Sequence, residues 1–365
     1  MPLNETITAG ALFDGRDMHG PSSLVVRDGI VVDIQPFSGA PDHHVVCPGF
    51  VDLQMNGYGD VDCADADIGA LLRLDDELAS AGTTSYLSTL ITDDTGKLSG
   101  RMNLIDRADA PGCIGIHLEG PFLGSAAGAH PRSLIVPPDL DWLGSLPGSV
   151  RLVTLGIEHE LSVQAVRLLH GMGITVSAGH TRPSRDQWDA AVRAGASMVT
   201  HLFNAMSGVH HREFGLALAS LVDDRVVTGL IADTRHVQQE AISLAFRSKP
   251  AGICLVSDTV AWEARWARNA GVTLRDGVPV LPDGTLAGSS TPLAECVRRC
   301  VSDCGVELST ALRSATSVPA ALVGRADIGV ISRGLPCDIV ALDRSLGVVR
   351  TWRRLQSPRG FQTDD

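Results

Sequence analysis

Residues 113–121 of the chain read CIGIHLEGP, a short apolar run that ends in His117, Glu119 and a Gly-Pro turn. Such a run is typical of a buried β-strand, and helix-length amphipathic stretches lie on both sides of it. From residue 48 onward, runs of this kind alternate with amphipathic stretches, a pattern that predicts βα units and a parallel sheet. We therefore expect eight strands, at residues 50–54, 84–89, 113–118, 151–155, 174–178, 198–202, 226–232 and 253–257.

Eight strands with intervening helices over about 280 residues predict an α/β protein with a (β/α)8 TIM-like barrel. We expect this barrel domain to occupy residues 49–328. The flanking sequences differ from it, because short β-like runs broken by turns precede residue 48 and strand-like runs return after residue 324. We therefore expect residues 1–48 and 329–365 to form one small β-sandwich domain, built from both ends of the chain.

The composition excludes several classes of protein. Of the 365 residues, 44% are hydrophobic and 20% are charged, which is typical of a globular protein. The net charge of -12 disfavours nucleic acid and anionic membranes as partners. The sequence contains neither an apolar run of membrane-spanning length nor a secretory signal, and its eight cysteines are scattered. We expect a cytoplasmic protein with no membrane or nucleic-acid partner.

Polar residues follow five of the expected strands at their carboxyl ends, where a barrel of this kind builds its active site. These residues are Glu119, His180, His201, His236 and Asp258. Each has an ordinary alternative, since a lone histidine at a strand end is more often structural. Glu119 would also suit a turn, and Asp258 would suit a helix N-cap. Their joint occurrence at one mouth of the barrel favours a metal site.

The residue types at this mouth are those of a metal-dependent hydrolase. Glu119, His180 and His201 provide a carboxylate and two imidazoles, which bind zinc and similar ions and leave a position open for water. The metal would acidify that water, and Asp258 would take its proton as the water attacks a carbonyl group. His236 would polarise the carbonyl oxygen. We expect one divalent metal ion per subunit, zinc first, with iron, manganese and cobalt as alternatives.

A second metal ion is disfavoured by the residues after the first strand. Gln54 and Asn56 stand where a His-x-His pair would hold it, and amide side chains are poor zinc ligands. Neither Lys97 nor Lys249 ends an expected strand, so a pair of metals bridged by a carbamylated lysine is disfavoured as well. We expect a mononuclear site, and a weak second site near Gln54 and Asn56 stays open.

Several short motifs resemble a known family. The most specific is THLFNAM at residues 200–206, followed by HRE at 211–213; the others include PGFVD at 48–52, HLEGPF at 117–122, GHT at 179–181 and LAGS at 286–289. In this order, over nearly the whole chain, they resemble the amidohydrolase superfamily and, within it, the N-acetylglucosamine-6-phosphate deacetylases. The resemblance implies hydrolysis of the N-acetyl amide of N-acetyl-D-glucosamine 6-phosphate to D-glucosamine 6-phosphate and acetate.

The resemblance also implies roles for individual residues. Glu119, His180 and His201 match the metal ligands of that family. Asp258 matches the general base that later protonates the leaving amine, and His236 matches the group that contacts the substrate amide. The substrate-binding positions implied are His130, Asn204, Ala205, Arg212, His236, Leu286, Ala287 and Gly288. Arg212 matches the phosphate ligand, which in this family acts across a homodimer interface, so we expect a homodimer.

Some positions depart from the family pattern and leave alternatives open. The loop after Asp258 carries Trp262 and Trp266, which either cover the sugar pocket or pack on the barrel rim. The substrate could therefore be another amino-sugar phosphate, such as N-acetylgalactosamine 6-phosphate. A D-aminoacylase-like amide hydrolase is a further alternative. A catalytically silent binding barrel is the last, although the sequence lacks neither the base nor a metal ligand.

Overall fold

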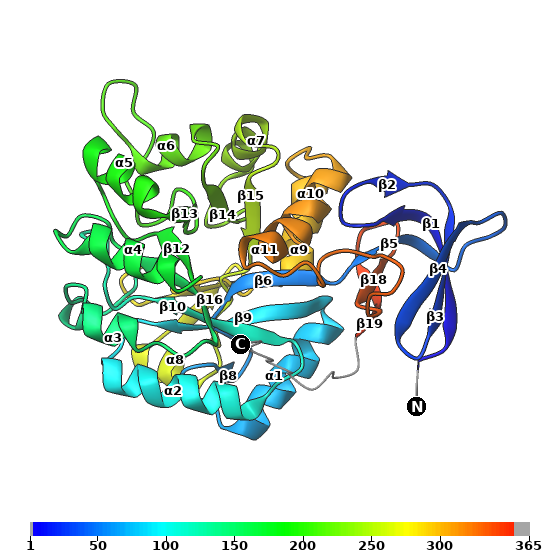
Figure 1. Ribbon diagram of the computed structural model, residues 1–365, viewed down its shortest axis with the longest axis horizontal. Helices are drawn as coiled ribbons and strands as arrows, with labels where there is room; N and C mark the ends of the chain where they lie inside the picture. Colours follow the sequence, from blue (N-terminus) through cyan, green and yellow to red (C-terminus); the bar gives the residue numbers. More distant parts are fainter. Residues whose placement is uncertain (1–2, 354–365) are drawn as a thin grey trace.

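Eight parallel strands form the central sheet of a barrel in the computed structural model, which describes residues 3–353 (Figure 1). They are β6 (Phe50–Met55), β9 (Thr83–Ile91), β10 (Cys113–Glu119), β11 (Val150–Leu155), β12 (Thr175–Ala178), β13 (Ala196–Val199), β14 (Val227–Ile231) and β15 (Ile253–Val256). Each strand pairs with its neighbour in this order. All eight expected strands are confirmed, although β13 ends at Val199, so that Thr200 and His201 lie in the loop beyond it.

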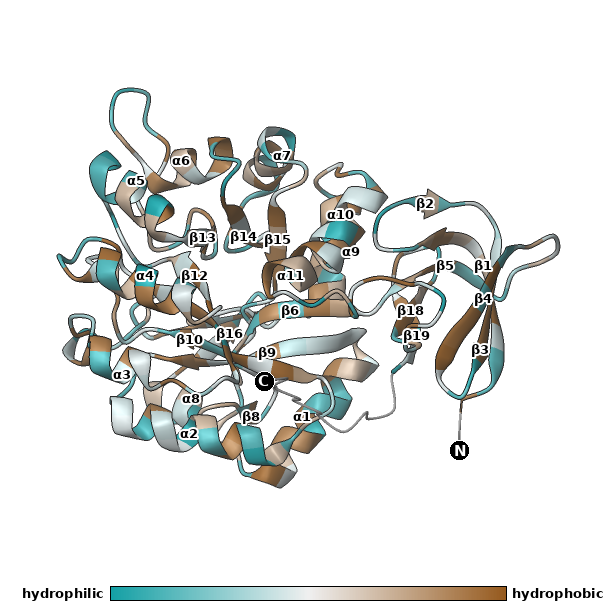
Figure 2. Ribbon diagram, viewed as in Figure 1, coloured by the Kyte–Doolittle hydropathy of each residue, from teal (hydrophilic) through white to brown (hydrophobic). Residues whose placement is uncertain are grey.

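Helices surround the barrel and cover its strands (Figure 1). They are α1 (Ile68–Ser80), α2 (Thr95–Ala108), α3 (Leu140–Gly144), α4 (Ser162–Gly171), α5 (Arg185–Ala194), α6 (Leu216–Val222), α7 (Gln239–Ser248), α8 (Arg265–Ala270), α9 (Leu293–Ser302), α10 (Leu308–Ser314) and α11 (Ser317–Leu322), with a 3-10 turn at Arg132–Leu134. Hydrophobic residues lie along the strands and on the helix faces turned toward them (Figure 2). Within residues 3–353, the helices are too short or too polar to cross a membrane.

Helix α5 illustrates how the local sequence determines these elements. Ser184 caps its amino end by accepting a hydrogen bond from the backbone of Gln187, whose side chain accepts one from the backbone of Ser184 in return. Gly195 ends the helix in a left-handed conformation with φ of 119°, which glycine adopts without steric cost. Trp188 is buried on the inner face of the helix. The chain therefore passes directly from α5 into β13.

Both ends of the chain meet in one small β-domain beside the barrel (Figure 1). Its strands are β1 (Glu5–Phe13), β2 (Met18–His19), β3 (Ser22–Arg27), β4 (Ile30–Pro36), β5 (His43–Pro48), β18 (Ile339–Leu342) and β19 (Val348–Trp352). They form a seven-stranded sheet in the order β19-β18-β5-β1-β3-β4, with β2 on β1. Residues 1–2 and 354–365 lie outside the described residues, and the domain boundaries at 48 and 329 stay a prediction.

Hydrogen bonds just beyond β15 close the barrel against β6. The backbone amide of Asp258 donates to the carbonyl oxygen of Gln54 at 2.9 Å. The backbone amide of Asn56 donates to the carbonyl oxygen of Thr259 at 2.9 Å. Asp52 on β6 reinforces this junction, because its Oδ1 accepts from the amides of Gln54 and Ser257, each at 3.2 Å. The Asp52 side chain is buried, which raises its pKa to about 7 despite these hydrogen bonds.

The replacement Asp52→Asn tests this junction, because the amide oxygen keeps both hydrogen bonds and carries no charge. The folded protein holds the Asp52 proton more tightly than the unfolded chain. The wild type should therefore lose stability relative to the variant as pH rises from about 4 to about 7, by at most about 1.4 kcal/mol per pH unit. Urea unfolding of both proteins across this range measures the difference. An unchanging difference would contradict the account, and Asp303→Asn, at an exposed position, is the control.

Candidate metal centre and substrate cleft

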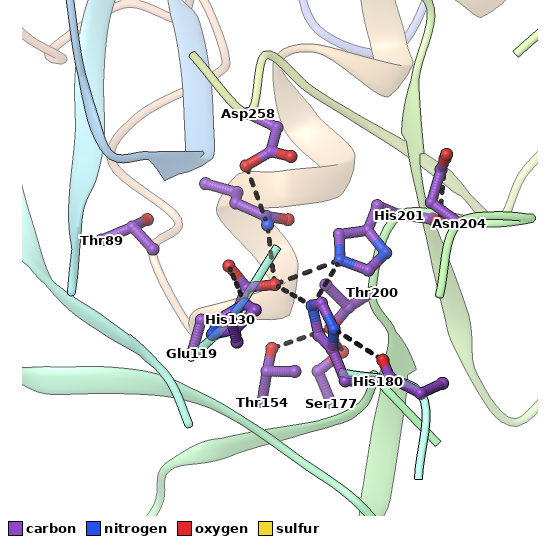
Figure 3. Close-up of polar contacts among 12 residues, drawn as sticks. Thr89, Glu119, His130, Thr154, Ser177, His180, Thr200, His201, Asn204 and Asp258 are labelled. Atoms are coloured by element: carbon purple, nitrogen blue, oxygen red, sulfur yellow. Dashed lines mark hydrogen bonds and ion pairs between the residues drawn. The ribbon is translucent and has the colours of Figure 1, made fainter. Parts of the chain in front are cut away.

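The three expected metal ligands converge at the carboxyl ends of the strands (Figure 3). Glu119 is the last residue of β10, and His180 and His201 each follow a strand by two residues. Oε1 of Glu119 lies 3.1 Å from Nε2 of His180 and 3.1 Å from Nε2 of His201, and these two nitrogens are 3.0 Å apart. All three side chains are buried. The structure thus brings together the three residues that the sequence predicted as ligands.

The backbone at this mouth is strained in a consistent way. His180, His201 and Asp258 have positive φ angles of 51°, 31° and 49°. For residues other than glycine this conformation costs roughly 1–2 kcal/mol each, and it persists only where the surrounding structure enforces it. Such residues concentrate at functional sites. Here the strain turns three polar side chains toward the centre of the barrel mouth.

The chemistry of the three side chains fits a bound cation. Nδ1 of His180 lies 3.1 Å from the carbonyl oxygen of Ala126, so this nitrogen carries the proton and donates. In the neutral ring, Nε2 then presents a lone pair to the Glu119 carboxylate. Burial would raise the pKa of Glu119, but its imidazole partners hold that pKa well below its usual range. An ionised carboxylate and a facing nitrogen lone pair at such short distances are stabilised by a positive charge between them, which a divalent metal ion would supply.

His130 lies next to this cluster. Its Nε2 is 3.9 Å from Oε2 of Glu119, and its ring packs edge-on against His180 with the centroids 4.3 Å apart. Glu119, His130 and His180 offer ligand atoms within 4.8 Å of one another, which makes His130 a second possible neighbour of a metal ion. Its Nδ1 is 2.9 Å from Oγ1 of Thr92. Burial lowers the pKa of His130 to about 3, so the ring is neutral, with Nε2 on the side of Glu119.

Asp258 lies across the cluster and is held by two amide side chains. Nδ2 of Asn56 donates to Oδ1 of Asp258 at 2.9 Å, and Nε2 of Gln54 donates to the same oxygen at 3.1 Å. The Gln54 nitrogen also lies 3.1 Å from Oε1 of Glu119. Burial, with the negative charge of Glu119, raises the pKa of Asp258 to about 6. From the sequence, Gln54 and Asn56 were expected only to be poor metal ligands, and this positioning role was not predicted.

A chain of polar side chains lies beneath the cluster, inside the barrel. Nδ1 of His117 is 3.2 Å from Oγ1 of Thr89, and its Nε2 is 2.9 Å from Oγ1 of Thr154. The Thr154 hydroxyl is 2.8 Å from that of Thr200, which is 2.6 Å from that of Ser177 (Figure 3). Burial lowers the pKa of His117 to about 4. Thr89 and Thr154 engage both ring nitrogens, which favours a role of His117 in orienting its neighbours over direct binding of a metal.

His236 is oriented by a carboxylate. Oδ2 of Asp233 lies 2.7 Å from Nδ1 of His236, and Oδ1 accepts from the backbone amides of Arg235 and His236. Burial would raise the pKa of Asp233, but the hydrogen bond to His236 lowers it overall. With Nδ1 occupied in this way, Nε2 is the ring atom left to meet a substrate. The spacing of three residues between Asp233 and His236 was visible in the sequence, but the pairing was not inferred from it.

The residues expected to bind the sugar phosphate lie outside the metal cluster. The Asn204 side chain donates to the carbonyl oxygens of His201 and Leu202, at 3.3 and 3.2 Å, at the edge of the cluster (Figure 3). Ala205 has a positive φ of 47° in the same loop. Arg212 is exposed on the long loop that leads into α6, and the interactions described for residues 3–353 do not join it to the cluster. Among residues 3–353, no described interaction therefore links Arg212, the residue predicted to bind the phosphate, to the metal cluster.

The turn at Leu286, Ala287 and Gly288 packs against the segment that carries Asp258. The amide of Ser289 donates to the carbonyl oxygen of Asp258 at 2.8 Å. Gly288 has a φ of 126°, and a Cβ atom there would lie 2.4 Å from Cγ1 of Val260. Only glycine allows this close approach. The turn is therefore part of the wall around Asp258, next to the two-stranded hairpin of β16 (Thr273–Arg275) and β17 (Val278–Val280).

The two tryptophans after Asp258 occupy different surroundings. Trp262 packs edge-on against Tyr58, with the ring centroids 5.1 Å apart, where a second hairpin joins β7 (Gly57–Tyr58) to β8 (Val61–Asp62). Trp266, on α8, lines a cavity that reaches Glu119 and Asp258. Of the two alternatives, rim packing describes Trp262 and a cleft position describes Trp266.

Comparison with known proteins places this geometry in a family. Residues 45–360 match the amidohydrolase family. The chain belongs to the amidohydrolase family. Within this family, the chain is 35% identical to an N-acetylglucosamine-6-phosphate deacetylase from Bos taurus, over 91% of this chain and 87% of the relative. It is 31% identical to an N-acetylgalactosamine-6-phosphate deacetylase from Escherichia coli, over 90% of this chain and 92% of the relative.

A solved amidohydrolase structure agrees with the fold along nearly the whole chain. It is that of a mutant N-acetyl-D-glucosamine-6-phosphate deacetylase from Mycobacterium smegmatis in complex with N-acetyl-D-glucosamine-6-phosphate. The TM-score is 0.89 at 28% identity, and the match covers 96% of this chain and 98% of that one. The expected (β/α)8 fold and the expected family are therefore confirmed.

Metal analysis of purified variants tests the candidate centre of this amidohydrolase. Glu119→Gln and His201→Asn each remove one proposed ligand, so we expect metal content to fall at least tenfold, because loss of even an outer-shell partner lowers affinity about 10–100-fold. Inductively coupled plasma mass spectrometry after dialysis measures the metal per chain. His44→Asn, at an exposed position in the small domain, is the control. Metal retained at the wild-type level in both ligand variants would contradict the assignment.

Proposed function

We propose that this amidohydrolase is a metal-dependent deacetylase that hydrolyses the N-acetyl amide of N-acetyl-D-glucosamine 6-phosphate, giving D-glucosamine 6-phosphate and acetate. The observation that carries the proposal is the placement of a carboxyl base, Asp258, across from Glu119, His180 and His201. The deacetylase relatives described above support the same substrate. The reaction would serve amino-sugar metabolism.

Glu119, His180 and His201 would hold one divalent ion per subunit, and two imidazoles with a carboxylate favour zinc, with iron, manganese and cobalt as alternatives. When bound, the ion supplies Lewis-acid activation of water and of the amide carbonyl group. Asp258 would accept the proton of the attacking water and then give it to the leaving nitrogen. Gln54 and Asn56 both donate to Oδ1 of Asp258, so Oδ2 is the oxygen left for proton transfer.

His236 would stabilise the charge that develops on the amide oxygen. The Asp233 carboxylate fixes the ring through Nδ1. A proton on Nε2 would make this atom a fixed hydrogen-bond donor, and a fixed donor aimed at developing negative charge is among the strongest catalytic contributions. His130, neutral and beside Glu119, would contact the substrate from the other side of the cluster.

Arg212 would bind the 6-phosphate, since a planar guanidinium is a natural bidentate partner for phosphate oxygens. Its exposed position on a projecting loop supports a homodimer in which this loop reaches the cleft of the second subunit. Asn204, Ala205 and the turn at Leu286, Ala287 and Gly288 would complete the sugar site. The cytoplasm is the proposed compartment, because buried thiols such as Cys296 and Cys300 persist in reduced form there.

N-acetylgalactosamine 6-phosphate is the second candidate substrate, because the Escherichia coli relative is a deacetylase of that sugar phosphate. The two sugars differ only at the hydroxyl of carbon 4. Acetate release from both compounds, each with and without the 6-phosphate, separates the alternatives. A D-aminoacylase-like enzyme would show no dependence on the phosphate, and a silent binding barrel would release no acetate at all.

The replacement Asp258→Asn removes the proton acceptor and keeps an Oδ1 that accepts from Gln54 and Asn56. We expect kcat to fall by about 10²–10⁴-fold, the usual contribution of a general base, with metal content unchanged. Acetate release and metal analysis on the same preparation provide the two readouts. Asp303→Asn is the matched surface control. Retained turnover in Asp258→Asn would show that another group is the base.

The replacement Arg212→Ala tests the phosphate site. A charge-assisted hydrogen bond contributes about 1.5–3 kcal/mol, so KM for the phosphorylated sugar should rise about 10- to 100-fold. KM for the sugar without phosphate should stay unchanged. Arg167→Ala, at an exposed position on α4, is the control. An equal effect of Arg212→Ala on both compounds would favour the D-aminoacylase-like alternative.

A further inference from the structure

A cavity of about 820 Å³ opens beside the metal cluster on the side of β9 and α8. Glu119 and Asp258 lie at its inner end, so it is continuous with the catalytic centre. Its walls include the apolar side chains of Leu90, Leu98, Val260 and Trp266 and, at the end of β9, Ile91. A volume of this size lies in the range that encloses a whole small-molecule ligand, about 300–1,000 Å³.

Three cationic side chains of the cavity wall have carboxylate partners in the same wall. Arg101 and Arg265 share the two oxygens of Asp65, at 3.2 and 3.0 Å. Nζ of Lys97 lies 3.1 Å from Asp93. Each of these cations already has a carboxylate partner, so the cavity favours an uncharged, largely apolar group over an anion.

The cavity and the sugar-phosphate positions lie in different loops of the barrel mouth. Most of the described residues that line the cavity come from β9 and the loop after it, from α2, from the segment around β8 and from α8, and the others are Asn56, Glu119, Asp258 and Val260. Asn204, Arg212 and His236 are not among them, because they belong to the loops after β13 and β14. Consider a substrate whose amide carbonyl carbon lies between Glu119 and Asp258 and whose sugar points toward Asn204. In this pose, the acyl substituent is the part of the substrate that enters the cavity.

We propose that this cavity is an acyl pocket that admits chains longer than acetyl, so that N-propionyl and N-butyryl amino-sugar phosphates are also substrates. The inference rests on the proposed function. The reaction is the same hydrolysis: the water oxygen bonds to the acyl carbon, the C–N bond breaks, the nitrogen takes a proton, and a carboxylate leaves. An acetyl methyl group fills only a small part of the cavity, and each further buried methylene contributes a factor of about four to binding.

The test compares kcat/KM of the metal-loaded wild type for the N-acetyl, N-propionyl and N-butyryl forms of glucosamine 6-phosphate. We expect the two longer compounds to react within tenfold of the acetyl compound. In Ile91→Trp, an indole enters the cavity from the end of β9, and the ratio of butyryl to acetyl kcat/KM should fall at least tenfold. Ala64→Phe, at another position in the cavity wall, should lower the same ratio. Leu72→Trp, on α1 outside the cavity wall, should leave it unchanged.

The outcomes separate this inference from the proposed function. Hydrolysis of the acetyl compound with the longer ones more than 100-fold slower overturns the acyl pocket and leaves the deacetylase function in place. An unchanged butyryl to acetyl ratio in both Ile91→Trp and Ala64→Phe also overturns the pocket. Failure to hydrolyse the acetyl compound overturns the proposed function, and with it the inference that rests on it.

Discussion

The arrangement of the barrel mouth depends on one buried carboxylate. Glu119 is ionised and only 3% exposed, in a place where an unpaired charge would be very costly. Its oxygen faces two imidazole nitrogens at 3.1 Å, and the proton that His180 donates to Ala126 leaves a lone pair on the facing atom. A cation between these atoms would resolve the conflict. Glu119 ends β10, and His180 and His201 follow β12 and β13, so a shared cation would tie together the carboxyl ends of three strands.

Asp258, the proposed base, is held by the segment in which a His-x-His pair would bind a second metal. Gln54 on β6 and Asn56 just beyond it donate to the same oxygen of Asp258, while the adjoining backbone hydrogen bonds close the barrel between β6 and β15. Barrel closure and orientation of the base are therefore one structural feature. The amide side chains orient the carboxylate without adding charge, and they leave its other oxygen toward the cleft.

The sequence predicted the fold and the convergence of Glu119, His180 and His201 at one mouth of the barrel, because both follow from local patterns. Buried strands are short apolar runs, and the polar residue after each run must lie at the common mouth of a barrel. The hydrogen bonds of Gln54 and Asn56 to Asp258 could not be predicted in this way, since they join residues more than 200 positions apart. The position of Arg212 could not be predicted from the sequence either, because its loop projects from the barrel and its proposed partner belongs to another subunit.

The central claim is that one cation links Glu119, His180 and His201. Anomalous X-ray scattering from crystals of the metal-loaded protein, recorded at the absorption edge of the bound element, tests it most directly. The account predicts one strong peak about 2.0–2.2 Å from Oε1 of Glu119 and from Nε2 of His180 and His201. A peak held by other residues, or density for a bridging water with no anomalous signal at this position, would contradict it.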